Sequence, residues 1–123
     1  MTLLAKLIAS EEGFGKPNTL PTRRHNPGDL RHSPHSEHPG GPAHADDIGA
    51  IDTDEHGWQD EERQLRIDAD RGLTLAETIY QWAPQKDHND PGKYLSDVLA
   101  GFHARGHAVT GDMPLAQVLL IAG

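Results

Sequence analysis

Apolar residues recur along most of this chain with the spacing of amphipathic helices, each of which has one buried face. The first predicted helix covers residues 2–13, and Gly13 is typical of a helix end. Its apolar face consists of Leu3, Leu4, Leu7 and Ile8. Further helices are predicted over residues 55–70, over 74–82, from Pro91 to just before Gly106, and after Pro114. The pattern therefore predicts a mostly helical chain.

Capping residues support two of these helix starts. Thr74 and Glu77 have the spacing of a capping box, and Asp90 followed by Pro91 combines an N-cap with a proline in the first turn. In the helix over 55–70 the residues expected to face inward are Trp58, Leu65 and Ile67. The acidic run over 55–62 is interpreted as the solvated face of that helix.

The remaining segments are irregular or extended. Residues 14–45 are rich in proline, glycine, histidine, serine and asparagine and show no helical period, which predicts a long loop region. A short β-prone run follows at 48–51. The predicted fold class is therefore α+β, mostly helical with a small β element, in one domain over residues 1–123.

Composition narrows the possible functions. The 123 residues carry a formal charge of −8, which disfavours nucleic acid as a partner. The chain contains no cysteine, which excludes disulfides and thiolate zinc sites. No apolar run approaches the roughly 20 residues of a membrane span, so no membrane insertion is expected. The apolar start lacks a basic flank, so no signal peptide is expected.

Two adjacent acids, Glu11 and Glu12, close the first predicted helix. A carboxyl group there lies near the negative end of the helix dipole, which favours its protonated form. A protonated carboxyl group is the proton donor that glycoside cleavage requires. The apolar face points closer to Glu11, and a helix that also buries Ala5 and Ala9 removes this conflict with Glu12, so both acids stay candidates. The alternative is a pair of solvated acids.

The segment that begins at Asn26 is a turn signal. Pro27 sets φ at the first turn position, and Gly28 accepts a positive φ at the next. The amide of Asn26 either contacts a sugar or hydrogen-bonds its own turn, and the sequence leaves both alternatives open.

Together these segments resemble the phage-associated lysozyme-like and lytic-transglycosylase-like proteins of the lysozyme superfamily. The segments that carry the resemblance are Glu12-Gly13-Phe14, Leu20-Pro21-Thr22-Arg23, Asn26-Pro27-Gly28-Asp29-Leu30, Trp82-Ala83-Pro84 and Asn89-Asp90-Pro91 with Tyr94. The chain departs from the pattern at His25 and Asp29, where many relatives have asparagine. Its histidine-rich stretch over 32–45 is also longer than the resemblance implies.

The resemblance implies a lysozyme-like fold that cleaves bacterial peptidoglycan without a cofactor. Glu12 would be the general acid, with Glu11 as the alternative. The residues expected to bind substrate are Asn26, Asp29, Asn89 and Tyr94. Tyr94 also lies on the apolar face of its helix, where core packing is an equal alternative. The expected protein is a monomer that belongs to a phage virion, or that waits in the host cytoplasm before release to the cell wall.

Two reactions fit this expectation. A muramidase that inverts at the sugar needs a second carboxylate, for which the candidates are Asp29, Asp46, Asp47 and Asp52. A lytic transglycosylase needs none, because the sugar's own 6-hydroxyl closes an anhydro product.

Two other classes compete with the enzyme. A metal-binding module would use His32, His35, His38 and His44 with Asp46 and Asp47. Pro34 and Pro39 prevent a helix there, so the spacing does not align ligands, and no metal is expected. The third class is a non-catalytic wall-binding or virion domain that retains the fold.

Overall fold

The computed structural model describes residues 1–37, 48–83 and 90–123. The helices of these parts of the chain are α1 (Leu3–Glu11), α2 (Leu20–Arg23), α3 (Asp54–Asp70), α4 (Leu75–Trp82), α5 (Pro91–Ala104) and α6 (Leu115–Val118). The mostly helical class is therefore confirmed, and each of the five predicted helices is present.

The predicted caps are also present. Thr74 and Glu77 form the capping box at the start of α4, and the carboxylate of Asp90 accepts hydrogen bonds from two backbone N–H groups at the start of α5. Thr2 caps α1 by accepting a hydrogen bond from the N–H of Ala5 at 3.2 Å. These side chains satisfy N–H groups that a helix start leaves without a partner in the helix.

Helix α2 lies inside the segment that was expected to be an irregular loop. It is a single turn that begins at Leu20, with Pro21 in its first turn. A helix of four residues is too short to repeat an apolar period, so the pattern of the sequence contains no signal for it. Proline in the first turn is the one feature that favours its start.

The expected β element is wrong in extent. The described residues contain no sheet, and the run over 48–51 makes a single antiparallel bridge between Ser36 and Ile51. Its backbone is bonded instead to the turn over 24–30. Gly49 donates to the carbonyl oxygen of Leu30 at 2.9 Å, and Ile51 donates to that of Arg24 at 2.9 Å. These bonds leave few groups for a neighbouring strand.

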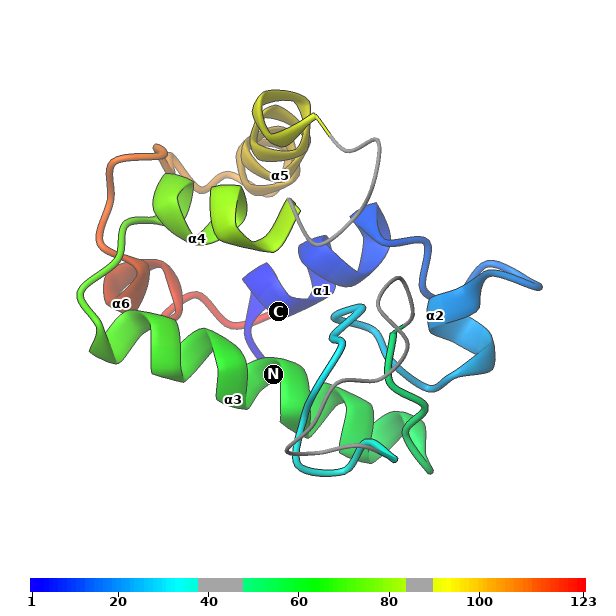
Figure 1. Ribbon diagram of the computed structural model, residues 1–123. Helices are drawn as coiled ribbons and strands as arrows, with labels where there is room; N and C mark the ends of the chain where they lie inside the picture. The colour runs from blue at the N-terminus through cyan, green and yellow to red at the C-terminus, as the bar shows by residue number, and fades with distance from the viewer. Residues whose placement is uncertain (38–47, 84–89) are drawn as a thin grey trace.

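Helix α1 lies at the centre of the molecule, where it packs against α3 on one side and α5 on another (Figure 1). α4 contacts α5 and α6, and α6 also contacts α3. The centre of the core consists of fully buried residues from these helices, among them Leu4, Ile8, Leu65, Ile79 and Phe102. Among the described residues, no helix combines the length and apolar character that crossing a membrane requires.

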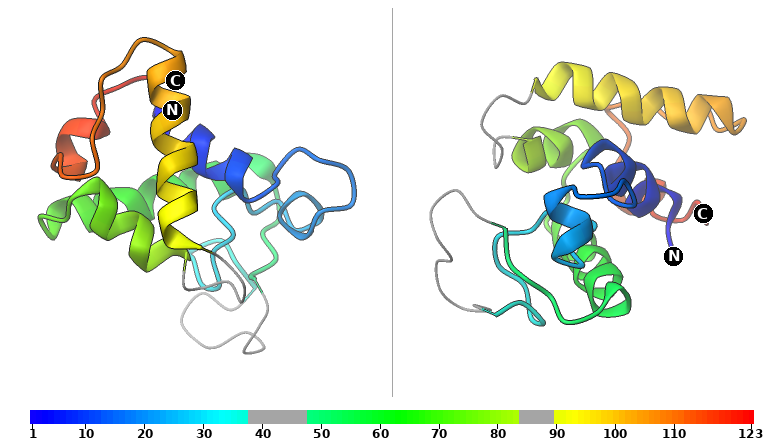
Figure 2. Two further views of the ribbon diagram at one scale, coloured as in Figure 1. Left: turned by 90° about the horizontal axis from the view of Figure 1, so that it is seen from above. Right: turned by 90° about the vertical axis from the view of Figure 1, so that its right-hand side faces the viewer.

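The two ends of the described chain lie side by side (Figure 2). Thr2 and Ala122 form an antiparallel bridge, and Leu3 donates to the carbonyl oxygen of Ile121 at 2.9 Å. The start of α1 is thereby fixed to the segment after α6.

Helix α3 does not have the solvated acidic face that was predicted. Three consecutive acids in its first half are buried, with exposed fractions of 2% for Asp60, 0% for Glu61 and 9% for Glu62. Leu65 is buried as predicted, whereas Trp58 and Ile67 are only half-buried. The acidic side of this helix is buried because the turn over 24–30 and the segment over 33–36 both pack against it.

Gly57 allows the closest of these contacts. A Cβ atom at this position would lie 2.1 Å from the carbonyl oxygen of His25 and 2.7 Å from Cδ of Pro27. The turn therefore touches the backbone of α3 at a point where only glycine fits.

We expect Gly57→Ala to lower the free energy of unfolding by about 2 kcal/mol or more, because the backbone of the turn must move away. Urea unfolding followed by circular dichroism measures this. Gly101→Ala is the matched control, since the three atoms nearest to its Cβ would all belong to the side chain of Leu7, the nearest at 2.5 Å. A leucine side chain can rotate, so the control should lose less. A control that loses as much as Gly57→Ala would contradict this account.

Candidate functional site

The two acids at the end of α1 differ in how far they are exposed to solvent. Glu12 is 7% exposed, whereas its neighbour Glu11 is exposed. The reason is that α1 buries two sides, with Ala5 and Ala9 packed inward beside the leucine face. Glu12 is the C-cap residue, and its N–H donates to the carbonyl oxygen of Ile8 at 2.9 Å. The geometry therefore favours Glu12 over Glu11 as a partly enclosed acid.

Tyr94 of α5 fixes the carboxyl group of Glu12. Its hydroxyl group donates a hydrogen bond of 2.7 Å to Oε2 of Glu12, and both side chains are buried. Burial raises the pKa of Tyr94 far above its usual value, and the charge of Glu12 raises it further. The phenol therefore stays protonated and keeps donating. Tyr94 packs in the core with its hydroxyl group bonded to the candidate acid, and its contact with substrate stays a prediction.

Glu11 has different neighbours. Partial burial raises the pKa of Glu11, and the charge of Asp97 on α5 adds to that effect. Asp97 in turn makes an ion pair of 2.7 Å with Lys93. Glu11 therefore belongs to a surface group of charges on α1 and α5.

Sequence analysis missed a second buried acid, Glu61 of α3. Its side chain is 0% exposed, and burial raises its pKa well above the usual range, with the charges of Glu62 and Glu12 adding to the effect. Folding thus raises this pKa. The stability that the protonated group contributes is complete below the pKa of the unfolded chain and is lost as the pH rises through that of the folded chain. Its spacing of four residues from Leu65 was the available signal.

Asn26 holds the turn together. It is 0% exposed, its Nδ2 donates to the carbonyl oxygens of Leu30 at 2.7 Å and Gly49 at 2.9 Å, and its Oδ1 accepts from the N–H of Leu30 at 2.9 Å. Of the two alternatives for Asn26, the structure has the bond to its own turn. Because the side chain is fully buried, it is not exposed for the predicted contact with a sugar.

The glycine of the turn has a role other than the one predicted. Gly28 does not adopt a positive φ, whereas Asp29, 4% exposed, does so with φ 55°. Space at Gly28 is tight instead, because a Cβ there would lie 3.0 Å from Cγ of Glu61 and 3.2 Å from Cζ2 of Trp82. Asp29 is thus buried in the turn.

Two histidines near the turn, His35 and His56, each pair with an aspartate. Nδ1 of His35 lies 2.6 Å from Oδ1 of Asp60, and its ring stacks on that of His56 at 4.0 Å. Nδ1 of His56 lies 2.7 Å from Oδ1 of Asp52, a hydrogen bond that raises the pKa of His56 and lowers that of Asp52. Asp52 is exposed and bonded to His56, so it does not stand as a free second carboxylate.

No group of three potential metal ligands occurs within residues 1–37, 48–83 and 90–123. His32 is exposed, and His35 is bonded to Asp60. The other predicted ligands and site residues lie outside the described residues, namely His38, His44, Asp46, Asp47 and Asn89.

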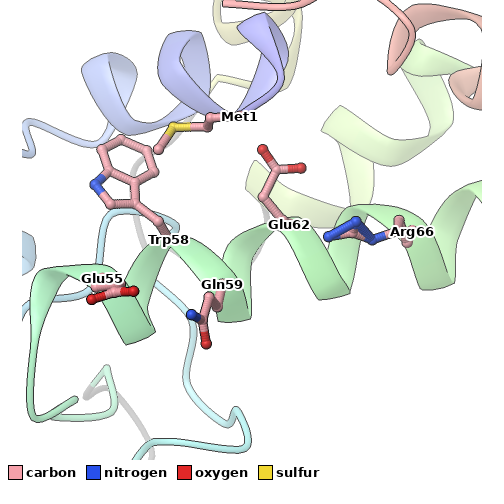
Figure 3. Close-up of a pocket in the computed structure, with 6 residues that line it drawn as sticks. All are labelled: Met1, Glu55, Trp58, Gln59, Glu62 and Arg66. Atoms are coloured by element: carbon pink, nitrogen blue, oxygen red, sulfur yellow. The ribbon is translucent and has the colours of Figure 1, made fainter.

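A separate groove of about 490 Å³ lies along α3 (Figure 3). Its lining residues are Met1, Glu55, Trp58, Gln59, Glu62 and Arg66. The Trp58 ring contacts the Phe14 ring edge to face at 5.2 Å, and Glu62 accepts hydrogen bonds from Thr2. Glu12 does not line this groove, so the groove and the candidate acid are different sites.

A comparison of the chain with models of known protein families, with curated proteins and with solved structures finds no match in any of the three.

Proposed function

We propose that this protein is a peptidoglycan-cleaving glycosidase of the lysozyme type, with Glu12 as its general acid. The observation that supports this most is the pairing of Glu12 with Tyr94 at 2.7 Å, at the end of a helix that encloses the carboxyl group without sealing it. An acid with partial access to solvent can meet a substrate oxygen, and the hydrogen bond from Tyr94 holds its carboxyl group in one orientation.

In the proposed reaction Glu12 transfers its proton to the glycosidic oxygen as the bond between that oxygen and the anomeric carbon breaks. Tyr94 holds Oε2 of Glu12 and so fixes the orientation of the carboxyl group. When the proton has left, the same phenol stabilises the carboxylate that remains. Either water or the sugar's own 6-hydroxyl then attacks the positively charged anomeric carbon, and the proton that this oxygen loses goes to the Glu12 carboxylate or to a second carboxylate.

The product distinguishes these two outcomes. We expect digestion of purified peptidoglycan to release muropeptides, and mass spectrometry shows their ends. Reducing ends establish a muramidase-type hydrolase, and anhydro ends, lighter by one water, establish a lytic transglycosylase. Of the acids proposed as a second carboxylate, Asp29 is buried and Asp52 is bonded to His56, so neither favours the hydrolase.

A protein that binds peptidoglycan in a sedimentation assay but releases no fragment between about pH 5 and pH 8, the range in which carboxyl groups and histidines titrate, would overturn the proposal. The non-catalytic wall-binding domain would then take its place.

A further inference from the structure

The groove along α3 is not lined by Glu12, and the proposed reaction gives it no role. Its volume of about 490 Å³ is within the usual range for sites that bind small ligands. Five of its six lining residues come from α3, at positions 55, 58, 59, 62 and 66, and Met1 lies across from them (Figure 3). Residues with this spacing share one face of a helix and here extend along it for about 16 Å.

A second hollow continues the groove past Glu62 and Arg66. It has a volume of about 340 Å³ and shares Met1, Glu62 and Arg66 with the first. Its other lining residues come from the two ends of the described chain, namely Thr2, Leu119, Leu120 and Ala122. Because three residues line both hollows, a ligand in the first can extend directly into the second. The shape therefore fits a linear molecule of more than one unit.

Trp58 gives the groove an aromatic surface. Its ring is half-buried, and Phe14 contacts it edge to face at 5.2 Å, with an angle of 76° between the two ring planes. This contact favours one orientation of the indole ring, which still lines the groove. A flat apolar surface of this kind stacks well on the C–H face of a sugar ring.

The polar groups of the groove include both donors and acceptors. Glu62 accepts two hydrogen bonds from Thr2 on Oε1, at 2.7 Å and 3.0 Å, so its Oε2 remains available as an acceptor. Gln59 and Arg66 are exposed, and neither side chain is bonded to another within residues 1–37, 48–83 and 90–123. Glu55 adds a second carboxylate. Together these groups match hydroxyl and acetamido groups, which both donate and accept hydrogen bonds.

The charge and polarity of the groove disfavour several other classes of ligand. Two carboxylates and one guanidinium group leave a net negative charge, which repels nucleic acid and acidic peptides. Four of the six lining side chains are polar, so a wholly apolar helix or lipid tail would bury polar groups without partners. An uncharged molecule with an apolar ring face and a rim of hydroxyl and amide groups avoids both costs.

We propose that this groove is a second carbohydrate-binding site, which holds a strand of N-acetylated sugars at a place other than Glu12. One sugar ring stacks on Trp58, and its hydroxyl and acetamido groups bond to Gln59 and Glu62. Arg66 donates to the next sugar, in the second hollow. The class of ligand follows from the groove, whereas the choice of peptidoglycan as the polymer rests on the function proposed above. A second point of attachment keeps the protein on an insoluble polymer between cleavage events.

The test is a titration of the wild type with the trisaccharide of N-acetylglucosamine, followed by NMR of the indole N–H groups of the two tryptophans. We expect the Trp58 resonance to move until the site is saturated. The buried Trp82, whose Nε1 donates to the carbonyl oxygen of Gly28 at 2.9 Å, is the internal reference. N-acetylglucosamine alone cannot fill both hollows and should bind about tenfold or more weakly. Movement of Trp82 alone, or equal affinities for the two sugars, would overturn the proposal.

Arg66→Ala and Arg63→Ala form a matched pair of variants. Both arginines are exposed on α3, and Arg66 lines the groove whereas Arg63 does not. We expect Arg66→Ala to weaken binding of the trisaccharide about tenfold, because a hydrogen bond from a charged donor is lost. Arg63→Ala should stay within about twofold of the wild type, as expected of an exposed residue outside the site. Equal effects of the two substitutions would contradict the role of the groove.

This binding test does not depend on catalysis. If the Trp58 resonance moves in a protein that releases no muropeptides, the groove is a carbohydrate site and the proposed function fails. If muropeptides are released and the Trp58 resonance does not move, the proposed function stands and the second site is overturned. Movement of Trp58 with a lysine-rich peptide, but not with the trisaccharide, would also overturn it, because the groove would then bind a protein partner.

Discussion

Glu12→Gln is expected to lower the rate of muropeptide release by about 10²–10⁴-fold, the contribution that a positioned general acid makes to catalysis. The amide has nearly the same shape as the acid, and its oxygen can still accept the hydrogen bond from Tyr94. The fold should therefore remain, which circular dichroism and thermal unfolding would verify. Binding to peptidoglycan should also remain, because the substitution removes only the proton that is transferred.

Glu11→Gln is the matched control for this experiment. It makes the same chemical change one residue away, on an exposed side chain whose charged neighbours include Asp97 and Lys93. We expect its rate of muropeptide release to stay within about threefold of the wild type, which is less than the tenfold change that corresponds to one pKa unit. If Glu11→Gln were the inactive variant and Glu12→Gln the active one, the assignment of the acid would be wrong.

The second large effect is expected on stability, from Asn26→Asp. The side chain is fully buried, and its Nδ2 donates to two backbone carbonyl oxygens. In aspartate an oxygen replaces this nitrogen, so it cannot donate a hydrogen bond to either carbonyl oxygen. We expect the free energy of unfolding at pH 7 to fall by about 3 kcal/mol or more, since two buried hydrogen bonds are lost and a carboxylate is buried.

This loss should depend on pH in a defined direction. Burial raises the pKa of the new carboxyl group in the folded state, so the destabilisation should shrink as the pH falls and the group becomes protonated. Urea unfolding at two pH values measures the change. Gln59→Glu makes the same amide-to-acid change on an exposed residue of α3, and its effect should be small. Equal losses in the two variants would show that burial of Asn26 is not the cause.

The helices of this protein could be predicted because their signals are local. The period of Leu3, Leu4, Leu7 and Ile8 and the caps at Thr74 and Asp90 lie within the elements that they define. The β-prone run over 48–51 was misleading for the opposite reason. Its backbone partners lie about 20 residues earlier, in the turn that Asn26 organises, and no local pattern describes such a pairing.

The candidate site was predictable in part. The choice of Glu12 followed from the resemblance, and burial of Ala5 and Ala9 only removed the objection from helical geometry. Tyr94 was also singled out, although its bond to Glu12 was not foreseen. Glu61 was missed because it belongs to an acidic run, and charged residues in a run were expected to be exposed to solvent. Whether such a run is exposed depends on what packs over it, and here that is a turn brought close by two glycines, Gly28 and Gly57.

The bridge between Thr2 and Ala122 has a consequence for the connectivity of the chain. Because residues 1 and 123 lie side by side, a short linker could join them, and new ends could be opened at an exposed turn such as Gly72 without separating neighbours in space. The order of the helices along the polypeptide would change to α4, α5, α6, α1, α2, α3. The position of each helix would stay the same, and Glu12 and Tyr94 would be separated by fewer residues than the 82 of the natural order.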